Sequence, residues 1–192
     1  MRAISGIWGL VFSLALLGCG GSSKPPEPAA VSGGAASSPS SGLITPDALT
    51  RCAGVTVEKA ATIVGASPAD LTDYSRPEGK MRLCLYQNTK DRSKAVSFTL
   101  SRRDSVEGAS TSMRNERENM IMAQGAIDRV SGSKSKDKAL QDVSGIGDEA
   151  FYSPMNGAIM LRVANVISQV TAPKDMALKK RAAEEVARGL RQ

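Results

Sequence analysis

The first 45 residues of this 192-residue chain cannot build a hydrophobic core, and this confines the fold to the remainder. An apolar run extends from Ile7 to Leu17, which is shorter than the roughly 20 residues that span a bilayer. Residues 20–44 are rich in Gly, Ser, Pro and Ala without apolar periodicity, so we expect a flexible tether there. Residues 46–192 should then form a single domain, which is a typical length for one core.

The short apolar run ends in a motif for lipid attachment. Arg2 precedes the run, and Gly18 and Cys19 follow it, in the order of a bacterial lipoprotein signal. We therefore expect a signal peptide over 1–18, and a lipidated Cys19 followed by the tether over 19–45. Diacyl and N-acyl chains would hold the protein at a membrane outside the cytoplasm, because one chain alone binds only marginally. The alternative is an ordinary secretory signal in which Cys19 is incidental.

Two further cysteines follow, Cys52 and Cys84. An even pair in an oxidising compartment most simply forms a disulfide. This bridge would close a loop of about 33 residues and contribute roughly 3–4 kcal/mol by restricting the unfolded chain. The alternative, a reactive thiol, lacks a partner that could activate it, because the chain contains no histidine.

The hydrophobic patterns predict alternating helices and strands. Thr45-Pro46 is typical of a helix start, while Thr56 and Gly65 can cap and end a second helix. Periodicity predicts helices over about 45–52, 57–64, 105–124 and 174–190, and strands over about 81–86, 96–100, 150–152, 159–163 and 166–170. Polar or Pro- and Gly-containing stretches predict loops over 66–79, 88–93 and 131–138. Hairpin connections favour an α+β fold with a mainly antiparallel sheet and helices packed on one face.

The charge balance is basic, with 25 Lys and Arg against 19 Asp and Glu, a net charge of +6. Solubility is the simplest explanation, although contacts with anionic lipid head groups fit it too. We expect no nucleic-acid partner, because the aromatic content is only 4% and the aromatic residues do not alternate with basic ones.

The absence of histidine removes the usual general base and metal ligand, and with them serine–histidine and cysteine–histidine catalysis. The chain also lacks a Walker loop, a Gly-x-Ser-x-Gly motif and a zinc-binding set of cysteines. The sequence thus predicts a protein that is not an enzyme, with no catalytic residue, no cofactor and no metal.

Two short patterns near residue 147 could carry chemistry. Asp148-Glu149 could be a carboxylate pair, but neighbouring strand residues point to opposite faces and should not converge. Gly145 and Gly147 could cradle a phosphate, but no helix is expected to follow them. A turn before a strand is the simpler interpretation of both.

Two other patterns are equally weak. Met120 and Met122 could bind copper(I), although core packing explains them more simply. Lys134, Lys136 and Lys138 could support serine–lysine chemistry, but they fall in an expected loop.

The order of these features resembles the small envelope lipoproteins of unknown function in actinobacteria, the Lpq/Lpr type and their DUF relatives. The resemblance covers about 50–190, and its most specific parts are the two cysteines, with Cys84-Leu85-Tyr86 in a strand, and the segment Gly-Ile-Gly-Asp-Glu-Ala-Phe-Tyr at 145–152. It implies an extracytoplasmic α+β domain with one disulfide, usually without known catalysis, and some relatives are similar to extracellular sensor domains. No functional residue can be transferred, because the group has no agreed active-site motif.

These observations favour a non-catalytic binding module for an apolar envelope molecule or a partner protein. The pocket or groove would lie between the sheet and the longer helix, and the sequence identifies no ligand-binding residue. The alternative is a structural or surface-associated lipoprotein that contacts anionic lipids or polymers.

Overall fold

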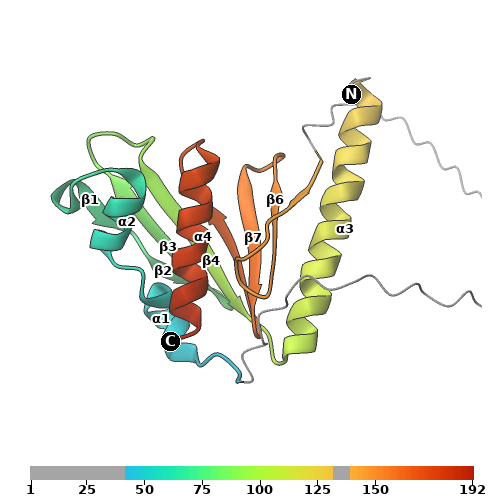
Figure 1. The fold of residues 1–192 in the computed structure, drawn as a ribbon, viewed down its shortest axis with the longest axis horizontal. Helices are drawn as coiled ribbons and strands as arrows, with labels where there is room; N and C mark the ends of the chain where they lie inside the picture. Colours follow the sequence, from blue (N-terminus) through green and yellow to red (C-terminus); the bar gives the residue numbers. More distant parts are fainter. Residues whose placement is uncertain (1–41, 132–138) are drawn as a thin grey trace, which may run out of the picture. The chain divides into compact units, whose positions relative to one another are not determined.

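The computed structural model describes residues 42–131 and 139–192, which belong to the compact unit Ala35–Gln192. This part of the chain forms four α-helices and one eight-stranded antiparallel sheet (Figure 1). The predicted class, a single α+β domain with a disulfide, is therefore confirmed. The expected signal peptide, Cys19 and most of the expected tether lie outside the described residues, as do Lys134, Lys136 and Lys138.

The helices are α1 (Pro46–Thr50), α2 (Val57–Val64), α3 (Val106–Ser131) and α4 (Met176–Leu190), with 3-10 turns η1 (Cys52–Gly54) and η2 (Pro68–Asp70). The strands are β1 (Leu71–Asp73), β2 (Arg76–Glu78), β3 (Met81–Asn88), β4 (Ala95–Arg102), β5 (Gln141–Asp142), β6 (Glu149–Ser153), β7 (Ala158–Val163) and β8 (Val166–Thr171). The sheet order is β1-β3-β4-β8-β7-β6-β5, and β2 also pairs with β3.

The longer elements match the sequence-based expectations, and the shortest do not. Strands β1 and β2 lie in the segment 66–79, which was expected to be a loop, and β5 was not expected at all. Strands of two or three residues are too short to show alternation, and Pro77 lies in β2, which is fully exposed. Helix α3 also extends beyond residue 124 to Ser131.

The sheet is covered on both faces, which corrects the expectation of helices on one face only. Ile159 and Leu161 of β7 belong to the main core, which includes residues of α2 and α4. Met160, between them, belongs with Phe151 and Ile167 to a second cluster that α3 covers. Consecutive buried residues in β7 are typical of a strand that is covered on both sides. Figure 1 shows α4 lying along the sheet. Helix α3 lies apart from α4, near β6 and β7.

Packing against the domain begins before the predicted boundary at Pro46. Ile44 is buried, and its backbone N–H donates to Oδ1 of Asn165 at 2.8 Å. Asn165 is itself fully buried, and its Nδ2 donates to the carbonyl oxygen of Arg103 at 2.8 Å. One buried amide thus joins the start of the domain to the connection between β4 and α3.

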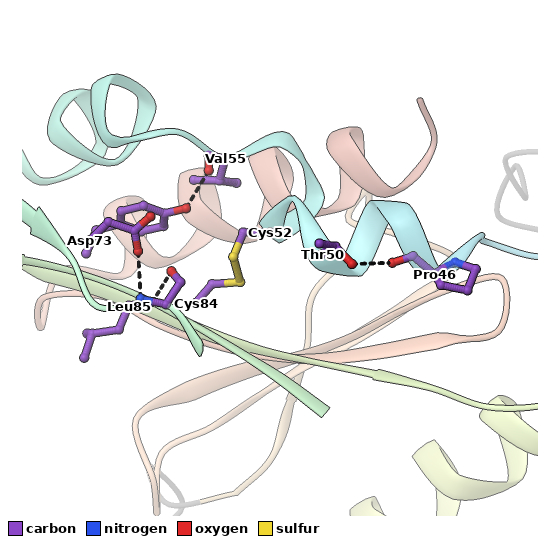
Figure 2. The surroundings of a disulfide bond; sticks show 9 residues. Pro46, Thr50, Cys52, Val55, Asp73, Cys84 and Leu85 are labelled. Atoms are coloured by element: carbon purple, nitrogen blue, oxygen red, sulfur yellow. Dashed lines mark hydrogen bonds between the residues drawn. A yellow bond between two sulfur atoms is a disulfide. The ribbon is translucent and has the colours of Figure 1, made fainter. Parts of the chain in front are cut away.

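The predicted disulfide is formed between Cys52 and Cys84, whose Cα atoms are 5.8 Å apart. Figure 2 shows the bridge joining the helical segment after α1 to strand β3. Cys52 and Ala53 have left-handed backbones, with φ of 50° and 52°. The hydroxyl of Tyr86, also on β3, donates to the carbonyl oxygen of Val55 at 2.6 Å. A covalent bond and a buried hydrogen bond therefore fix this turn on the sheet, and neither cysteine is a free thiol.

Helix α4 packs against both the sheet and this turn. A Cβ on Gly189 would lie under 3.0 Å from the carbonyl oxygen of Ala53, a separation that real Cβ atoms essentially never show. Lys179 is also buried on α4, where its Nζ donates to the carbonyl oxygen of Pro173 at 3.0 Å. Burial lowers the pKa of Lys179, and Asp175 opposes this shift.

Candidate functional site: the α3 groove

A groove of about 400 Å³ lies between α3 and the end of β6. Six residues of α3 line it, at positions i, i+3, i+4, i+7, i+8 and i+11, which lie on one face of a helix: Arg117, Met120, Ile121, Gln124, Gly125 and Asp128. The opposite wall comes from the segment before β5, from β6 and from the turn after it: Ala139, Leu140, Ser153 and Met155. We call this site the α3 groove.

The groove exists because only part of α3 lies on the sheet. Its buried residues, Ala109, Met113 and Met120, end well before the helix does. Beyond them Ile121, 55% exposed, and Val130, 91% exposed, have no sheet to pack against. Of these two, Ile121 contributes to the α3 wall of the groove.

Ser153 gives the groove a polar group without a partner. The residue is fully buried, and its Oγ has no hydrogen-bond partner among residues 42–131 and 139–192. Ser153 is two residues from Phe151 on β6, so both face α3. A buried hydroxyl without a partner costs about 1–3 kcal/mol, and a bound molecule that hydrogen-bonds to it would recover much of this.

Two charged residues line the α3 side of the groove. Arg117 donates to Oδ1 of Asp142 at 2.6 Å, and its guanidinium lies 5.3 Å from the ring centroid of Phe151. Asp128 accepts a hydrogen bond from Nε2 of Gln124 at 2.8 Å. The carboxylate of Asp142 balances the positive charge of Arg117, whereas the neutral amide of Gln124 does not balance the negative charge of Asp128.

Gly125 lines the groove, and a Cβ added there would meet no atom within 4 Å. The space beside this residue is therefore open, although glycine in a helix interior is unfavourable by about 0.5–1 kcal/mol relative to alanine. No close contact explains why glycine stands at this position.

The groove has the properties of a small-molecule site. Its volume falls within the usual range of roughly 300–1,000 Å³, and apolar side chains surround a few polar groups. No base among the described residues hydrogen-bonds to Ser153, so nothing there prepares its hydroxyl as a nucleophile. Over residues 42–131 and 139–192, no group of three His, Cys, Asp or Glu side chains could hold a metal ion.

The carboxylates of Asp148 and Glu149 do converge, contrary to the sequence-based expectation, but on an arginine. Arg162 lies 3.3 Å from Oδ2 of Asp148 and 3.4 Å from Oε2 of Glu149. The expectation failed because Asp148 precedes β6 and does not follow the alternation of the strand. Asp148 also accepts a hydrogen bond from the backbone of Ala164 at 2.6 Å, so this cluster joins the ends of two strands.

The turn interpretation of Gly145 and Gly147 agrees with the structure. Both have positive φ, 80° and 65°, and strand β6 follows them rather than a helix. A Cβ on Gly147 would lie under 3.0 Å from the carbonyl oxygen of Arg162, and the neighbouring Asp148 N–H donates to that oxygen at 2.8 Å. Glycine is required here for a close approach of two backbones.

The two methionines of the copper(I) hypothesis do not converge. Met120 is buried beside the sheet and lines the groove, whereas Met122 is 63% exposed and does not. The core interpretation is correct for Met120 only. The sequence identified none of the groove residues, although the three-and-four spacing of Ile121, Gln124 and Asp128 continues the helical pattern beyond the expected end at 124.

Comparison of the sequence with models of known protein families gave no match. Searches among curated proteins and among solved structures gave no match either. No helix within residues 42–131 and 139–192 has both the length and the apolar character needed to cross a membrane.

Proposed function

We propose that the protein is a non-catalytic binding module whose α3 groove takes up an apolar or amphipathic molecule of the bacterial cell envelope. The observation that carries this proposal is the fully buried Ser153 hydroxyl, which has no partner in the described structure and lines an apolar groove of about 400 Å³. A ligand that covers Ile121 and Met155, which are 55% and 44% exposed, would also remove apolar surface from water.

We further propose that the protein acts outside the cytoplasm and is held at a membrane by lipid on Cys19. The Cys52–Cys84 disulfide supports an oxidising compartment, because such bonds are rare in the cytosol. The order of residues around Cys19 supports the anchor. Cys19→Ser should release the protein from the membrane fraction of its host, and full retention of the variant would contradict the anchor.

The binding function can be tested by filling the groove. Gly125→Leu places a side chain in open space, and leucine favours a helix more than glycine does. We expect this variant to be at least as stable as the parent Cys19→Ser protein and to lose affinity for 1-decanol, measured by isothermal titration calorimetry. Glu118→Leu, an exposed α3 position that does not line the groove, serves as the matched control and should bind normally.

A second measurement addresses the natural ligand. Native mass spectrometry of the Cys19→Ser protein from the soluble extracytoplasmic fraction of its host should detect a copurifying small molecule, and Gly125→Leu should abolish this species. The proposal is wrong if 1-decanol does not bind, or if Gly125→Leu and Glu118→Leu bind it as tightly as the parent does.

A further inference from the structure

The two charges of the α3 groove stand far apart. Arg117 and Asp128 are separated by eleven residues of one helix, which at about 1.5 Å per residue places them roughly 16 Å apart along its axis. This exceeds the Debye length of about 8 Å at physiological salt, so a ligand group at one end is screened from the charge at the other. Each end can therefore be considered by itself.

The Arg117 end is already neutralised. Asp142 contacts the guanidinium at 2.6 Å, and Phe151 lies beneath it at 5.3 Å. An anionic ligand at this end would have to compete with the Asp142 carboxylate.

No ion pair with the carboxylate of Asp128 is formed within residues 42–131 and 139–192. Gln124 donates to this carboxylate. The guanidinium of the neighbouring Arg129 is directed to another acceptor, since its Nε donates to the carbonyl oxygen of Gly125 at 3.1 Å.

The position of Asp128 in the helix adds to this negative field. It lies in the last turn of α3, which ends at Ser131. The carbonyl end of a helix carries a partial negative charge, so a carboxylate is unfavourable there and a cation is favourable. A ligand cation would relieve both effects.

We propose that the ligand of the α3 groove is an amphipathic amine. This rests on the proposed function and specifies its ligand class. The ammonium group would lie beside the carboxylate of Asp128 and the side-chain amide oxygen of Gln124. Its apolar body would lie along Met120 and Leu140, near the Ser153 hydroxyl.

The test uses three probes with the same chain and different head groups: decylammonium, 1-decanol and decanoate, each below its micelle concentration. We expect decylammonium to bind about tenfold more tightly than 1-decanol, as is typical of one charge-assisted hydrogen bond in a partly buried site, and decanoate to bind more weakly than both. Added salt should weaken decylammonium binding and leave 1-decanol binding nearly unchanged.

Asp128→Asn should reduce the preference for decylammonium over 1-decanol, measured on the same variant, from about tenfold to about onefold. Asp104→Asn, an exposed position outside the groove, changes the net charge equally and should leave the preference intact. Equal binding of decylammonium and 1-decanol to the parent, or tighter binding of decanoate, would overturn the amine proposal while the binding function stands. If none of the probes binds, the binding function itself fails.

Discussion

The chain contains two helical glycines whose replacement by alanine should have opposite effects. Gly125 lies in α3 beside open space, whereas Gly189 lies in α4 against the backbone of Ala53. Neither has positive φ, so both substitutions begin from ordinary helical backbone. At Gly125 only the helix preference changes, and Gly125→Ala should raise the free energy of unfolding by about 0.5–1 kcal/mol.

Gly189→Ala cannot be accommodated in place, because the new Cβ would lie under 3.0 Å from the Ala53 carbonyl oxygen. The turn cannot move away, since the disulfide at Cys52 and the hydrogen bond to Val55 hold it. The last turn of α4 must therefore detach and expose Leu190, which is now 4% exposed. Burial of one leucine contributes about 1.5–3 kcal/mol, so we expect a net loss of about 1–3 kcal/mol.

Urea denaturation followed by far-ultraviolet circular dichroism measures both variants on one scale. A change in midpoint with an unchanged slope reports stability alone. For a domain of this size each kcal/mol moves the melting temperature by about 2–4 °C, so the two variants should separate by roughly 3–16 °C. Equal shifts in the same direction would show that α4 does not pack against the turn at 52–54 as described.

Three further outcomes follow from buried groups. Replacing Cys52 and Cys84 together with alanine should lower the free energy of unfolding by roughly 3–4 kcal/mol in urea denaturation, because the unfolded loop is no longer closed, and a loss below about 1 kcal/mol would contradict this. Burial raises the pKa of Tyr86 to about 12 from 10.0. The folded state therefore retains the proton more tightly, and stability should fall between about pH 10 and 12 by up to roughly 2–3 kcal/mol, a dependence that Tyr86→Phe should remove in alkaline melts. Ser153→Ala and Ser168→Ala each remove a fully buried hydroxyl without a partner in the described structure, so both should raise or maintain the melting temperature. Only Ser153 lines the groove, so only Ser153→Ala should change the affinity for 1-decanol.

The parts of the fold that could be predicted are those with strong local signals. The cap Thr56 and the left-handed Gly65 set the two ends of α2, and the structure shows both roles. Alternation identified β3 and β4, because only one face of each strand is fully buried. The disulfide followed from an even cysteine count and the expected compartment rather than from local pattern.

The coverage of the second sheet face could not be predicted from any one segment. In β7 the residues Ala158–Leu161 are all buried, and such a run does not say which helix covers which side. The answer depends on the packing of Met160 with residues of α3 that are at least forty positions away. The residues that line the groove were not identified for the same reason, since Ser153 and Asp128 line one groove only when α3 packs beside the sheet.

Three local departures from stable packing meet in the α3 groove, and this supports a binding site more strongly than the cavity does alone. Gly147 and Gly189 have close backbone contacts that require glycine, but Gly125 has none. Ser153 is a buried hydroxyl without a partner in the described structure, and Asp128 places a carboxylate at the carbonyl end of a helix. Each is unfavourable for the fold, by about 0.5–1, 1–3 and 0.3–1 kcal/mol respectively. Ser168 shows that one such defect can occur elsewhere, but three of different kinds around one apolar groove are expected where a ligand supplies the missing contacts.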